Sequence, residues 1–330
     1  MDFNGTVTIS GDTTLEDGAD LITATAGTSN FRAGVNAGNS IQSGGNFNVA
    51  VGDEAGTALT TGDKSTAIGY GALAAATTAL GNTAVGANAL GATTGQANTG
   101  VGEGALESNV AGTFNVAIGA NSLDADTTGS KSVAVGYASL STQNFTTATD
   151  GFNVAMGYES GVSITTGQFN VLLGGTSGDA LTDADFNVAV GHSALGTDTL
   201  GSRSVAVGHS ALNNQNFTTA TDAYNTAVGF FAGLAITTGR FNNLVGGLAG
   251  DALTTGNSNT AIGYNSLGSD TKGENSVAIG DQALATQNLT TATDTYNVAV
   301  GASAGNQVTT GTFNVLLGGT SGDALTDADF

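Results

Sequence analysis

The sequence predicts an all-β fold: a parallel β-solenoid, or β-roll, of about 17 coils built from 17-residue repeats. Three observations predict it. A glycine returns about every 17 residues from Gly52 to Gly318, the residues before each such glycine alternate as in a short strand, and the 330-residue chain has 52 Gly but no Pro. Proline would remove donors from a strand ladder, so its absence is typical of strands that are paired on both sides.

The repeat is the motif Asn-Val-Ala-Val-Gly followed by x-x-Ala-Leu or x-x-Ala-Gly. The glycine after the second Val is the anchor of each turn, and positions are counted from it, negative before and positive after. Anchors are 17 residues apart in nearly every case, 16 once and 21 three times. The anchors are Gly52, Gly69, Gly86, Gly102, Gly119, Gly136, Gly157, Gly174, Gly191, Gly208, Gly229, Gly246, Gly263, Gly280, Gly301 and Gly318, with Gly34 as a degenerate earlier copy.

A longer period is superimposed on the single turn. The 21-residue steps follow Gly136, Gly208 and Gly280, which are 72 residues apart. Each long step carries a near-identical insert, Gln-Asn-Phe-Thr-Thr at 143–147 and 215–219 and Gln-Asn-Leu-Thr-Thr at 287–291. This pattern indicates that a four-turn unit has been duplicated.

The residues before each anchor predict a short strand. Position −1 is aliphatic or Met in all sixteen turns, as in Val51, Ile68 and Val85, and position −3 is mostly Val or Thr. Position −2 is Ala in twelve turns. Because side chains alternate between the two faces of a strand, positions −1 and −3 share one face and the Ala column lies on the other.

Two ladders are predicted just before this strand. Position −4 is Asn in twelve turns and Ser in four, and stacked Asn side chains can form hydrogen bonds along a column of identical positions. Position −5 is aromatic in nine turns, which favours an aromatic stack over a ligand-binding box. The predicted structural ladder includes Asn48, Asn82, Asn115, Asn153 and Asn187, beside the anchors Gly52, Gly69 and Gly86.

Large aliphatic side chains alternate between two positions. Position +4 is Leu in nine turns and Gly in seven, and wherever it is Gly, position +7 is Leu, Ile or Val. Where position +4 is Leu, position +7 carries no large aliphatic side chain. One such side chain in each turn is what an interior of fixed cross-section requires, because voids and overpacking both reduce stability.

Each coil is expected to hold two short strands joined by turns, because 17 residues at roughly 3.3 Å each make a contour of about 56 Å. Gly, Asn and the Thr-Thr-Gly segments mark the corners. Coils about 4.8 Å apart give a solenoid roughly 80 Å tall.

Position +3 is Ala or Ser throughout, from Ala55 to Ser321, and we expect this column to face outward and to let another chain approach closely. The expected assembly is a parallel homotrimer about the fibre axis.

The charge balance excludes some classes of partner. The chain has 27 acidic and 6 basic residues, a formal net charge of −21, whereas nucleic-acid binding needs a basic footprint. We interpret the charge as an acidic coat that keeps a long particle soluble; the alternative is divalent cation binding by acidic clusters.

The chain has no Cys, so disulfides are excluded. No signal peptide and no apolar run of membrane-spanning length is evident, so we expect neither export by a cleaved signal nor membrane insertion.

Two segments resemble known repeats. Residues 259–267 (Asn-Thr-Ala-Ile-Gly-Tyr-Asn-Ser-Leu) and 275–280 (Asn-Ser-Val-Ala-Ile-Gly) are similar to the head repeats of YadA-like trimeric autotransporter adhesins. The pattern Thr-Ala-Ile-Gly-Tyr-x-Ala-Leu, followed by Thr-Thr-Gly, resembles bacteriophage tail-fibre proteins still more closely. The resemblance covers roughly residues 30–330 and implies a trimeric β-roll in an extracellular appendage, without implying a receptor. The repeat is longer than that of the autotransporters, and neither their stalk and anchor nor the self-cleaving chaperone of many tail fibres is evident.

The chain is expected to have two segments. Residues 1–29 lie outside the repeat and form an N-terminal cap or attachment segment, in which residues 6–10 alternate as a strand. Residues 30–330 form the repetitive solenoid shaft. The shaft ends mid-repeat, because Asp-Ala-Asp-Phe at 327–330 matches residues 183–186, which continue into another motif. We therefore expect a fragment, a processed product or one unit of a head-to-tail stack.

The chain is predicted not to be an enzyme and to need no cofactor. Catalysis needs a few unique, convergent groups, and a repeat makes each group non-unique. His192 and His209 are expected to stack on adjacent coils at position +1, which is elsewhere often Tyr. The candidates for weak Ca²⁺ binding are Asp179, Asp183 and Asp185, with the equivalent Asp323, Asp327 and Asp329.

Three functions are considered. The first is the structural fibre or shaft of a virion appendage, a phage tail fibre or spike that mediates host attachment. Its expected partners are further copies of itself, other virion or appendage proteins at its ends, and a cell-surface receptor bound through a tip not evident in this sequence. The second is a bacterial surface adhesin or a self-assembling extracellular filament. The third is an ice-binding solenoid, because Thr recurs, although its Thr residues are expected at corners rather than in a flat array.

Overall fold

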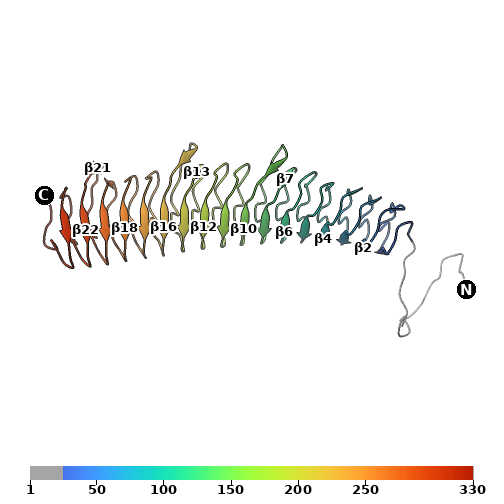
Figure 1. Ribbon diagram of the computed structural model, residues 1–330, viewed down its shortest axis with the longest axis horizontal. Helices are drawn as coiled ribbons and strands as arrows, with labels where there is room; N and C mark the ends of the chain where they lie inside the picture. Colours follow the sequence, from blue (N-terminus) through green and yellow to red (C-terminus); the bar gives the residue numbers. More distant parts are fainter. Residues whose placement is uncertain (1–24, 330) are drawn as a thin grey trace, which may run out of the picture.

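The computed structural model describes residues 25–329, which form one elongated parallel β-solenoid (Figure 1). A 17-stranded sheet takes one three-residue strand from each turn and runs along the whole solenoid. Strands of successive turns pair in parallel, so that Val51 is the partner of Ile68 and Ile68 the partner of Val85. The predicted fold class and the vertical columns are confirmed. The predicted N-terminal cap falls mostly on residues 1–24, outside the described residues.

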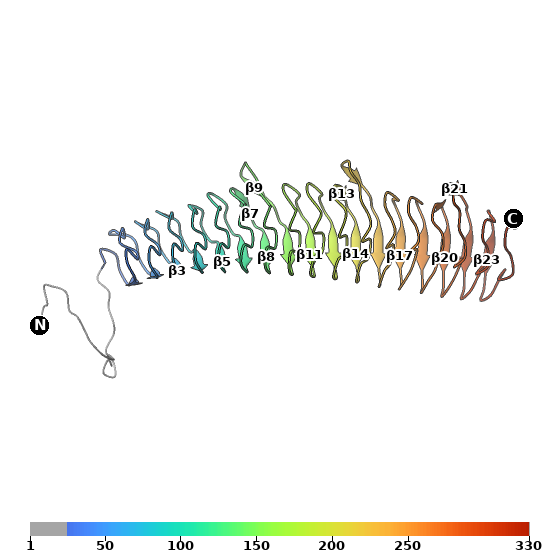
Figure 2. The same ribbon diagram turned by 180° about the vertical axis from the view of Figure 1, so that it is seen from behind.

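In the order of their pairing, the strands of the main sheet are β1 (Phe31–Ala33), β2 (Val49–Val51), β3 (Thr66–Ile68), β4 (Thr83–Val85), β5 (Thr99–Val101), β6 (Val116–Ile118), β8 (Val133–Val135), β10 (Val154–Met156), β11 (Val171–Leu173), β12 (Val188–Val190), β14 (Val205–Val207), β16 (Thr226–Val228), β17 (Asn243–Val245), β18 (Thr260–Ile262), β20 (Val277–Ile279), β22 (Val298–Val300) and β23 (Val315–Leu317). Three two-stranded ladders pair β7 (Gly129–Ser130) with β9 (Thr149–Asp150), β13 (Gly201–Ser202) with β15 (Thr221–Asp222), and β19 (Gly273–Glu274) with β21 (Thr293–Asp294). These ladders hold the inserts, which project from one edge of the solenoid (Figure 2).

The prediction of two strands in each coil is wrong. Outside the three short ladders, the wall opposite the main sheet consists of turns within the described residues. The reason is local: positions +2 and +4 adopt positive φ, as at Asn88 (56°) and Leu90 (53°), and a strand cannot continue through that conformation. Hydrogen bonds between coils still join this wall, and Thr hydroxyls reinforce them, as where Thr182 Oγ1 donates to the carbonyl of Thr199 at 3.0 Å.

The interior of each coil is filled by small side chains at positions −2 and +3. Ala50 and Ala55, at these two positions of one turn, are both fully buried. The prediction that position +3 faces outward is therefore wrong. Because the positive φ at position +2 reverses the alternation expected of an extended chain, position +3 turns inward. Where this position is Ser, its hydroxyl finds an internal acceptor, as Ser139 Oγ does at the carbonyl of Ala155 (3.1 Å).

The exchange of one large side chain between positions +4 and +7 is confirmed, and a third position takes part. Position −2 is Leu instead of Ala only where two successive turns have Gly at position +4. Leu172 lies between Gly161 and Gly178, and a Cβ added at either glycine would come within 2.7 or 2.8 Å of a Leu172 methyl group. The same arrangement surrounds Leu244 and Leu316. The core therefore conserves volume across turns as well as within them.

We expect Gly250→Leu to destabilise the solenoid by about 1–3 kcal/mol through overpacking. A Cβ at Gly250 would lie 2.8 Å from Leu244 and 2.9 Å from Leu253. The backbone conformation is not the obstacle, because Leu267 takes the same position with a similar φ (52°, against 55° at Gly250). Adding Leu244→Ala and Leu253→Ala should restore most of the lost stability, as measured by thermal melting. A triple variant no more stable than the single one would contradict this account.

Candidate self-association surface and buried polar sites

Positions −3 and −1 of the main sheet point away from the core and form one apolar face along the solenoid. In β3, Thr66 and Ile68 flank the buried Ala67, and Ile68 is 39% exposed. Met156 in β10 is 50% exposed. The predicted alternation is thus confirmed, with the aliphatic columns on the outside. An apolar face that continues over the full length of a molecule exceeds the patches of a few hundred Å² found on ordinary monomers and is typical of an interaction surface.

An aromatic ladder at position −5 borders one edge of this face. Ring centroids are 5.4 Å apart between Phe152 and Phe169, 4.9 Å between Phe169 and Phe186, and 5.9 Å between Tyr224 and Phe241. The aromatic residues at this position have φ between 49° and 61°, which turns their side chains out of the coil. The predicted aromatic stack is present. Because the rings stack face to face, they present their edges to the surroundings.

Cations continue this ladder in two of the turns that have no aromatic ring at position −5. Lys131 and Arg203 both stand at position −5. The Lys131 ammonium lies 5.2 Å from the centroid of the Phe152 ring, and the Arg203 guanidinium lies 5.2 Å from Phe186 and 5.8 Å from Tyr224. At these distances a cation is attracted to the face of an aromatic ring. The stack therefore continues from Phe186 through Arg203 to Tyr224.

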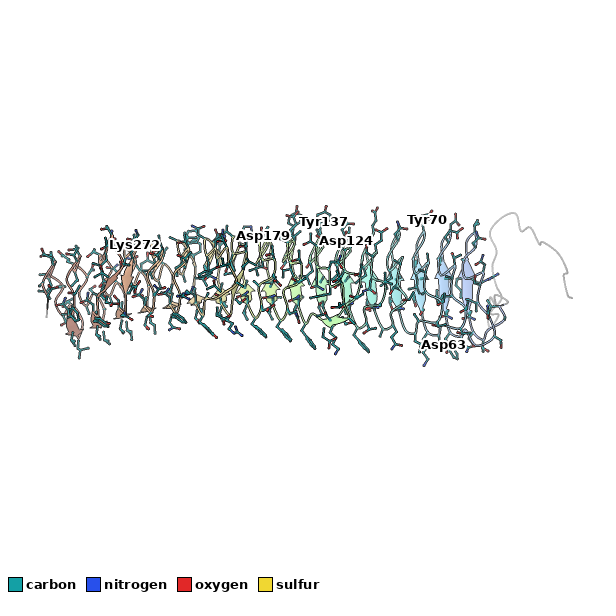
Figure 3. All side chains as sticks on the ribbon, turned by 90° about the horizontal axis from the view of Figure 1, so that it is seen from above. Asp63, Tyr70, Asp124, Tyr137, Asp179 and Lys272 are labelled. Atoms are coloured by element: carbon teal, nitrogen blue, oxygen red, sulfur yellow. The ribbon has the colours of Figure 1, made fainter. Side chains whose placement is uncertain are left out.

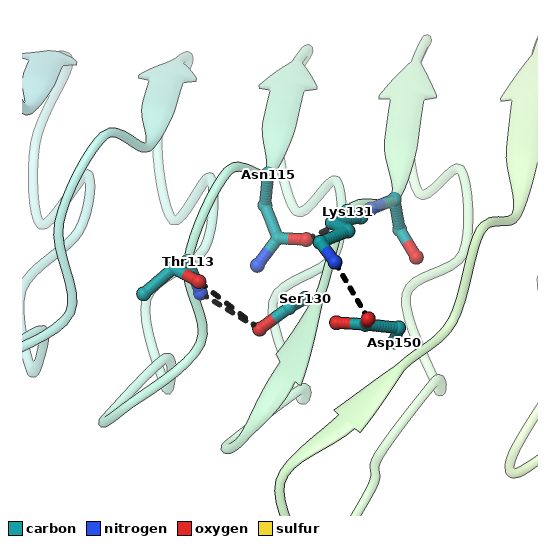
Figure 4. A network of polar contacts seen from close by, with 6 residues as sticks. Thr113, Asn115, Ser130, Lys131 and Asp150 are labelled. Carbon is teal, nitrogen blue, oxygen red and sulfur yellow. Dashed lines mark hydrogen bonds and ion pairs between the residues drawn. The ribbon is translucent and has the colours of Figure 1, made fainter.

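The same cations hold the inserts. Lys131 Nζ pairs with Asp150 at 2.6 Å at the end of the first insert (Figure 4), and Arg203 pairs with Asp222 in the second. In the third copy a neutral donor takes this place, and Asn275 Nδ2 donates to Asp294 at 2.6 Å. Exposed pairs of this kind contribute little stability, so we interpret them as orienting contacts between the ladder and each insert.

A second aromatic ladder, at position +1, borders the opposite edge of the apolar face. Tyr137 and Tyr158 stack at 5.6 Å, and Figure 3 shows Tyr137 on the opposite side of the solenoid from Asp63, which precedes a −5 position. His192 stacks on His209 at 5.4 Å, and His209 on Phe230 at 5.5 Å. The predicted stacking of the two histidines on adjacent coils is confirmed.

The Asn column at position −4 joins neighbouring coils and also spans each coil. The main-chain N–H of Asn115 donates to Asn98 Oδ1 at 2.9 Å, and Asn115 Nδ2 donates to the carbonyl of Gly129 at 2.8 Å. The predicted ladder is present, but its bonds mostly link side-chain amides to the main chain rather than to one another. Equivalent bonds to corner carbonyls are made by Asn48, Asn82, Asn153 and Asn187.

A buried polar cluster recurs every 72 residues and was not predicted. Asp126, at position +7, is fully buried, and its Oδ1 accepts from the main-chain N–H of Gly129 (2.9 Å) and of Phe145 (3.3 Å). Its Oδ2 accepts from Gln143 Nε2 at 2.6 Å, and Gln143 Oε1 accepts from Asn153 Nδ2 at 2.9 Å. The two other copies are Asp198 with Gln215 and Asn225, and Asp270 with Gln287 and Asn297.

The cluster explains why Ser replaces Asn at position −4 in these turns. Gln143 Nε2 also approaches Ser132 Oγ (3.3 Å), and its amide fills the space that a longer side chain at Ser132 would need. A signal was present in the sequence: Asp at +7, Ser at −4 and Gln at +7 occur together at each 72-residue step. Because Asp126 also binds the main chain at Phe145, we interpret the cluster as the anchor of the insert.

Burial raises the pKa of the Asp126 and Asp198 carboxyls above the ordinary value of 3.8, although hydrogen bonds from the neighbouring Gln and from the main chain oppose the rise. Burial also raises the pKa of the half-buried carboxyls of Asp124, Asp179, Asp185 and Asp251. Desolvation is thus the dominant effect on the carboxyls whose pKa is raised.

We expect the melting temperature to rise as the pH falls from about 7 towards 4. A carboxyl whose pKa is raised on folding stabilises the folded state fully below its unfolded pKa. This stabilisation is lost as the pH rises through the folded pKa. Protonation also reduces the repulsion among the 27 acidic residues. The Asp126→Asn/Asp198→Asn variant should show a smaller rise. Calorimetry across this pH range measures the effect, and a wild-type melting temperature that falls throughout would contradict it.

The three candidate Ca²⁺ ligands do not converge. The charged neighbours of Asp179 are Glu159 and His192, whereas those of Asp185 are Asp183 and Arg203. Asp185 Oδ1 accepts from the main-chain N–H of Gln168 at 2.7 Å. Among residues 25–329, no group of three His, Asp or Glu side chains is placed to hold a metal ion. The geometry therefore does not support a Ca²⁺ site.

The fold and its surfaces define the chain as a β-solenoid repeat protein with a continuous apolar sheet face. No helix in the described part of the chain is long and apolar enough to cross a membrane. Comparison with protein-family models, with curated proteins and with solved structures gives no match.

Proposed function

We propose that this protein is the structural shaft of an extracellular appendage, a phage tail fibre or spike that mediates host attachment, and that it acts as a parallel homotrimer. The observation that carries the proposal is the outer face of the main sheet, on which position −1 is aliphatic or Met in every turn along the long axis. A rod of constant cross-section is stiff, and an apolar stripe along it suits lengthwise association with further copies.

The size of the face supports a stable assembly. From position −5 to position +1 it is roughly 20 Å wide, and sixteen turns make it roughly 77 Å long, or about 1,500 Å² on each copy. A standard protein interface needs only about 800 Å² from each partner. Three faces of this width, arranged as a triangle around the fibre axis, each lie roughly 6 Å from that axis. This distance is close to half the ~10 Å spacing between packed sheets, so side chains can fill the centre of the trimer.

The assignment to a virion rests on the resemblance of the longer repeat pattern to tail-fibre proteins. The proposed partners are other virion or appendage proteins at the two ends and a cell-surface receptor at a tip. The alternative, a bacterial surface adhesin or self-assembling filament, is favoured by the shorter segments such as residues 275–280, which are similar to autotransporter heads. Both functions use the same lengthwise association.

The assembly is tested by sedimentation equilibrium and negative-stain electron microscopy of the purified chain. We expect a particle of three times the 32.1 kDa chain mass, seen as a rod roughly 80 Å long. A monomer over the micromolar concentration range, or a dimer, would contradict the trimer.

The location is tested by immunogold labelling with antibodies raised against the purified chain. Label on the tail appendages of virus particles supports the fibre. Label confined to the bacterial surface would replace it with the adhesin.

A further inference from the structure

We propose that the two aromatic edges of the apolar face pack against each other between neighbouring copies and seal the seams of the assembly. This inference rests on the proposed parallel homotrimer and assigns it a specific contact. The −5 ladder of one copy, with its exposed Phe and Tyr side chains, would contact the +1 ladder of the next copy at the same height.

The first observation is that both ladders occupy the same stretch of the axis. The −5 ladder is continuous from Lys131 to Phe241, and the +1 ladder runs over the same turns from Tyr137 to Phe230, with a gap at Gly175. Three turns within this stretch carry aromatic rings on both edges. Their pairs are Phe152 with Tyr158, Phe186 with His192, and Tyr224 with Phe230.

The second observation is exposure. Phe152 is 43% exposed and Tyr158 is 57% exposed, although both lie beside a sheet whose inward side chains are fully buried. Because these rings are exposed on both borders of the apolar face, they add to its apolar surface. The apolar surface therefore reaches from edge to edge in this stretch, which is what a contact that continues to the rim of an interface requires.

Rotational symmetry decides which edges meet. In a parallel assembly around an axis along the fibre, rotation brings the −5 edge of one copy beside the +1 edge of the next, never beside another −5 edge. The two positions are six residues apart in a coil that rises about 4.8 Å per turn, so they differ in height by only roughly 2 Å. Phe152 of one copy therefore faces Tyr158 of its neighbour.

The stacking within each ladder favours a second copy over a stacked ligand as the occupant. The faces of Phe169 are covered by Phe152 and Phe186, so a sugar or nucleobase finds no free ring face there. The exposed ring edges carry partial positive charge and suit edge-to-face contacts with other aromatic rings. The facing ladder of a neighbouring copy supplies such rings at the required height.

The test is disulfide cross-linking of the full chain, which has no Cys of its own. In the Phe152→Cys/Tyr158→Cys variant the two thiols of one chain are roughly 20 Å apart along the strand, beyond the limit of about 7 Å between Cα atoms for a disulfide. A bond can therefore form only between copies. We expect mild oxidation to produce a covalent trimer in denaturing gels without reductant, and reductant to return it to monomers.

The control is Phe152→Cys/His192→Cys, in which the second thiol is two turns away, roughly 10 Å along the axis. It should produce no covalent trimer.

A Phe152→Cys/Tyr158→Cys variant that sediments as a trimer but does not cross-link would overturn the seam and leave the proposed function intact. A covalent dimer from a dimeric particle would support the edge contact and overturn the three-fold assembly. A variant and wild type that both sediment as monomers would overturn both.

Discussion

Gly174→Ala is expected to destabilise the solenoid by about 3 kcal/mol or more. Gly174 is an anchor with φ of +137°, a conformation that L-residues rarely adopt. A Cβ there would lie 2.6 Å from the carbonyl oxygen of Gly191 in the next coil. That oxygen belongs to the main chain, so the strain can be relieved only by separating two coils.

Gly175→Ala is the matched control, because it adds the same methyl group one residue away. Its Cβ would find nothing nearer than His192 Cδ2 at 3.7 Å, and its φ is ordinary. We expect it to change stability by no more than about 0.5 kcal/mol. Guanidinium unfolding followed by circular dichroism compares the two variants. Equal stability of the two would show that anchor glycines are not required by the close approach of the coils.

The triple variant Leu173→Lys/Val190→Lys/Val207→Lys should dissociate the assembly into monomers and weaken association by about a thousandfold or more. The three side chains stand at position −1 of adjacent turns and point outward. In the proposed trimer, nine ammonium groups would be desolvated around one axis without partners, and this is strongly unfavourable. In the monomer the same lysines would reach solvent, so the coil should remain folded.

The control places three lysines elsewhere on the surface, as Thr61→Lys/Thr238→Lys/Thr310→Lys. These threonines are exposed at position +9, where Lys272 already stands. We expect this variant to sediment like the wild type, so a change of net charge alone would not explain dissociation. If the first variant remained a trimer with an unchanged melting temperature, the apolar sheet face would not be the interface.

Much of the fold was predictable because each turn repeats the same local pattern. The alternation at Val49, Ala50 and Val51 shows which residues share a face, since a strand has only two. The exchange between positions +4 and +7 reveals the interior, since one cross-section must be filled in every turn. Stacks such as Phe152 on Phe169 follow from the period alone, since identical positions of a solenoid lie one above another.

The buried sites could not be predicted in the same way, because they depend on contacts across a coil. Asp126 looked like one more acidic residue on a charged chain, and only its distance to Gln143 and to the main chain of Phe145 shows that it anchors an insert. The candidate Ca²⁺ ligands show a related effect: among residues 25–329 no three acidic side chains converge, because proximity in sequence does not place Asp179 beside Asp185 in a coil that turns between them.

By itself, then, the sequence determined the period, the single axis and the residues that share each column, because these follow from repetition. Only the tertiary structure decided which columns face outward on the far side of each anchor. Asn88 and Leu90 adopt positive φ, and each such residue reverses the direction in which the following side chains point. The column that begins at Ala55 therefore lies in the core, and the outer face of the main sheet is formed by Val, Ile and Thr side chains with aromatic rings along its edges.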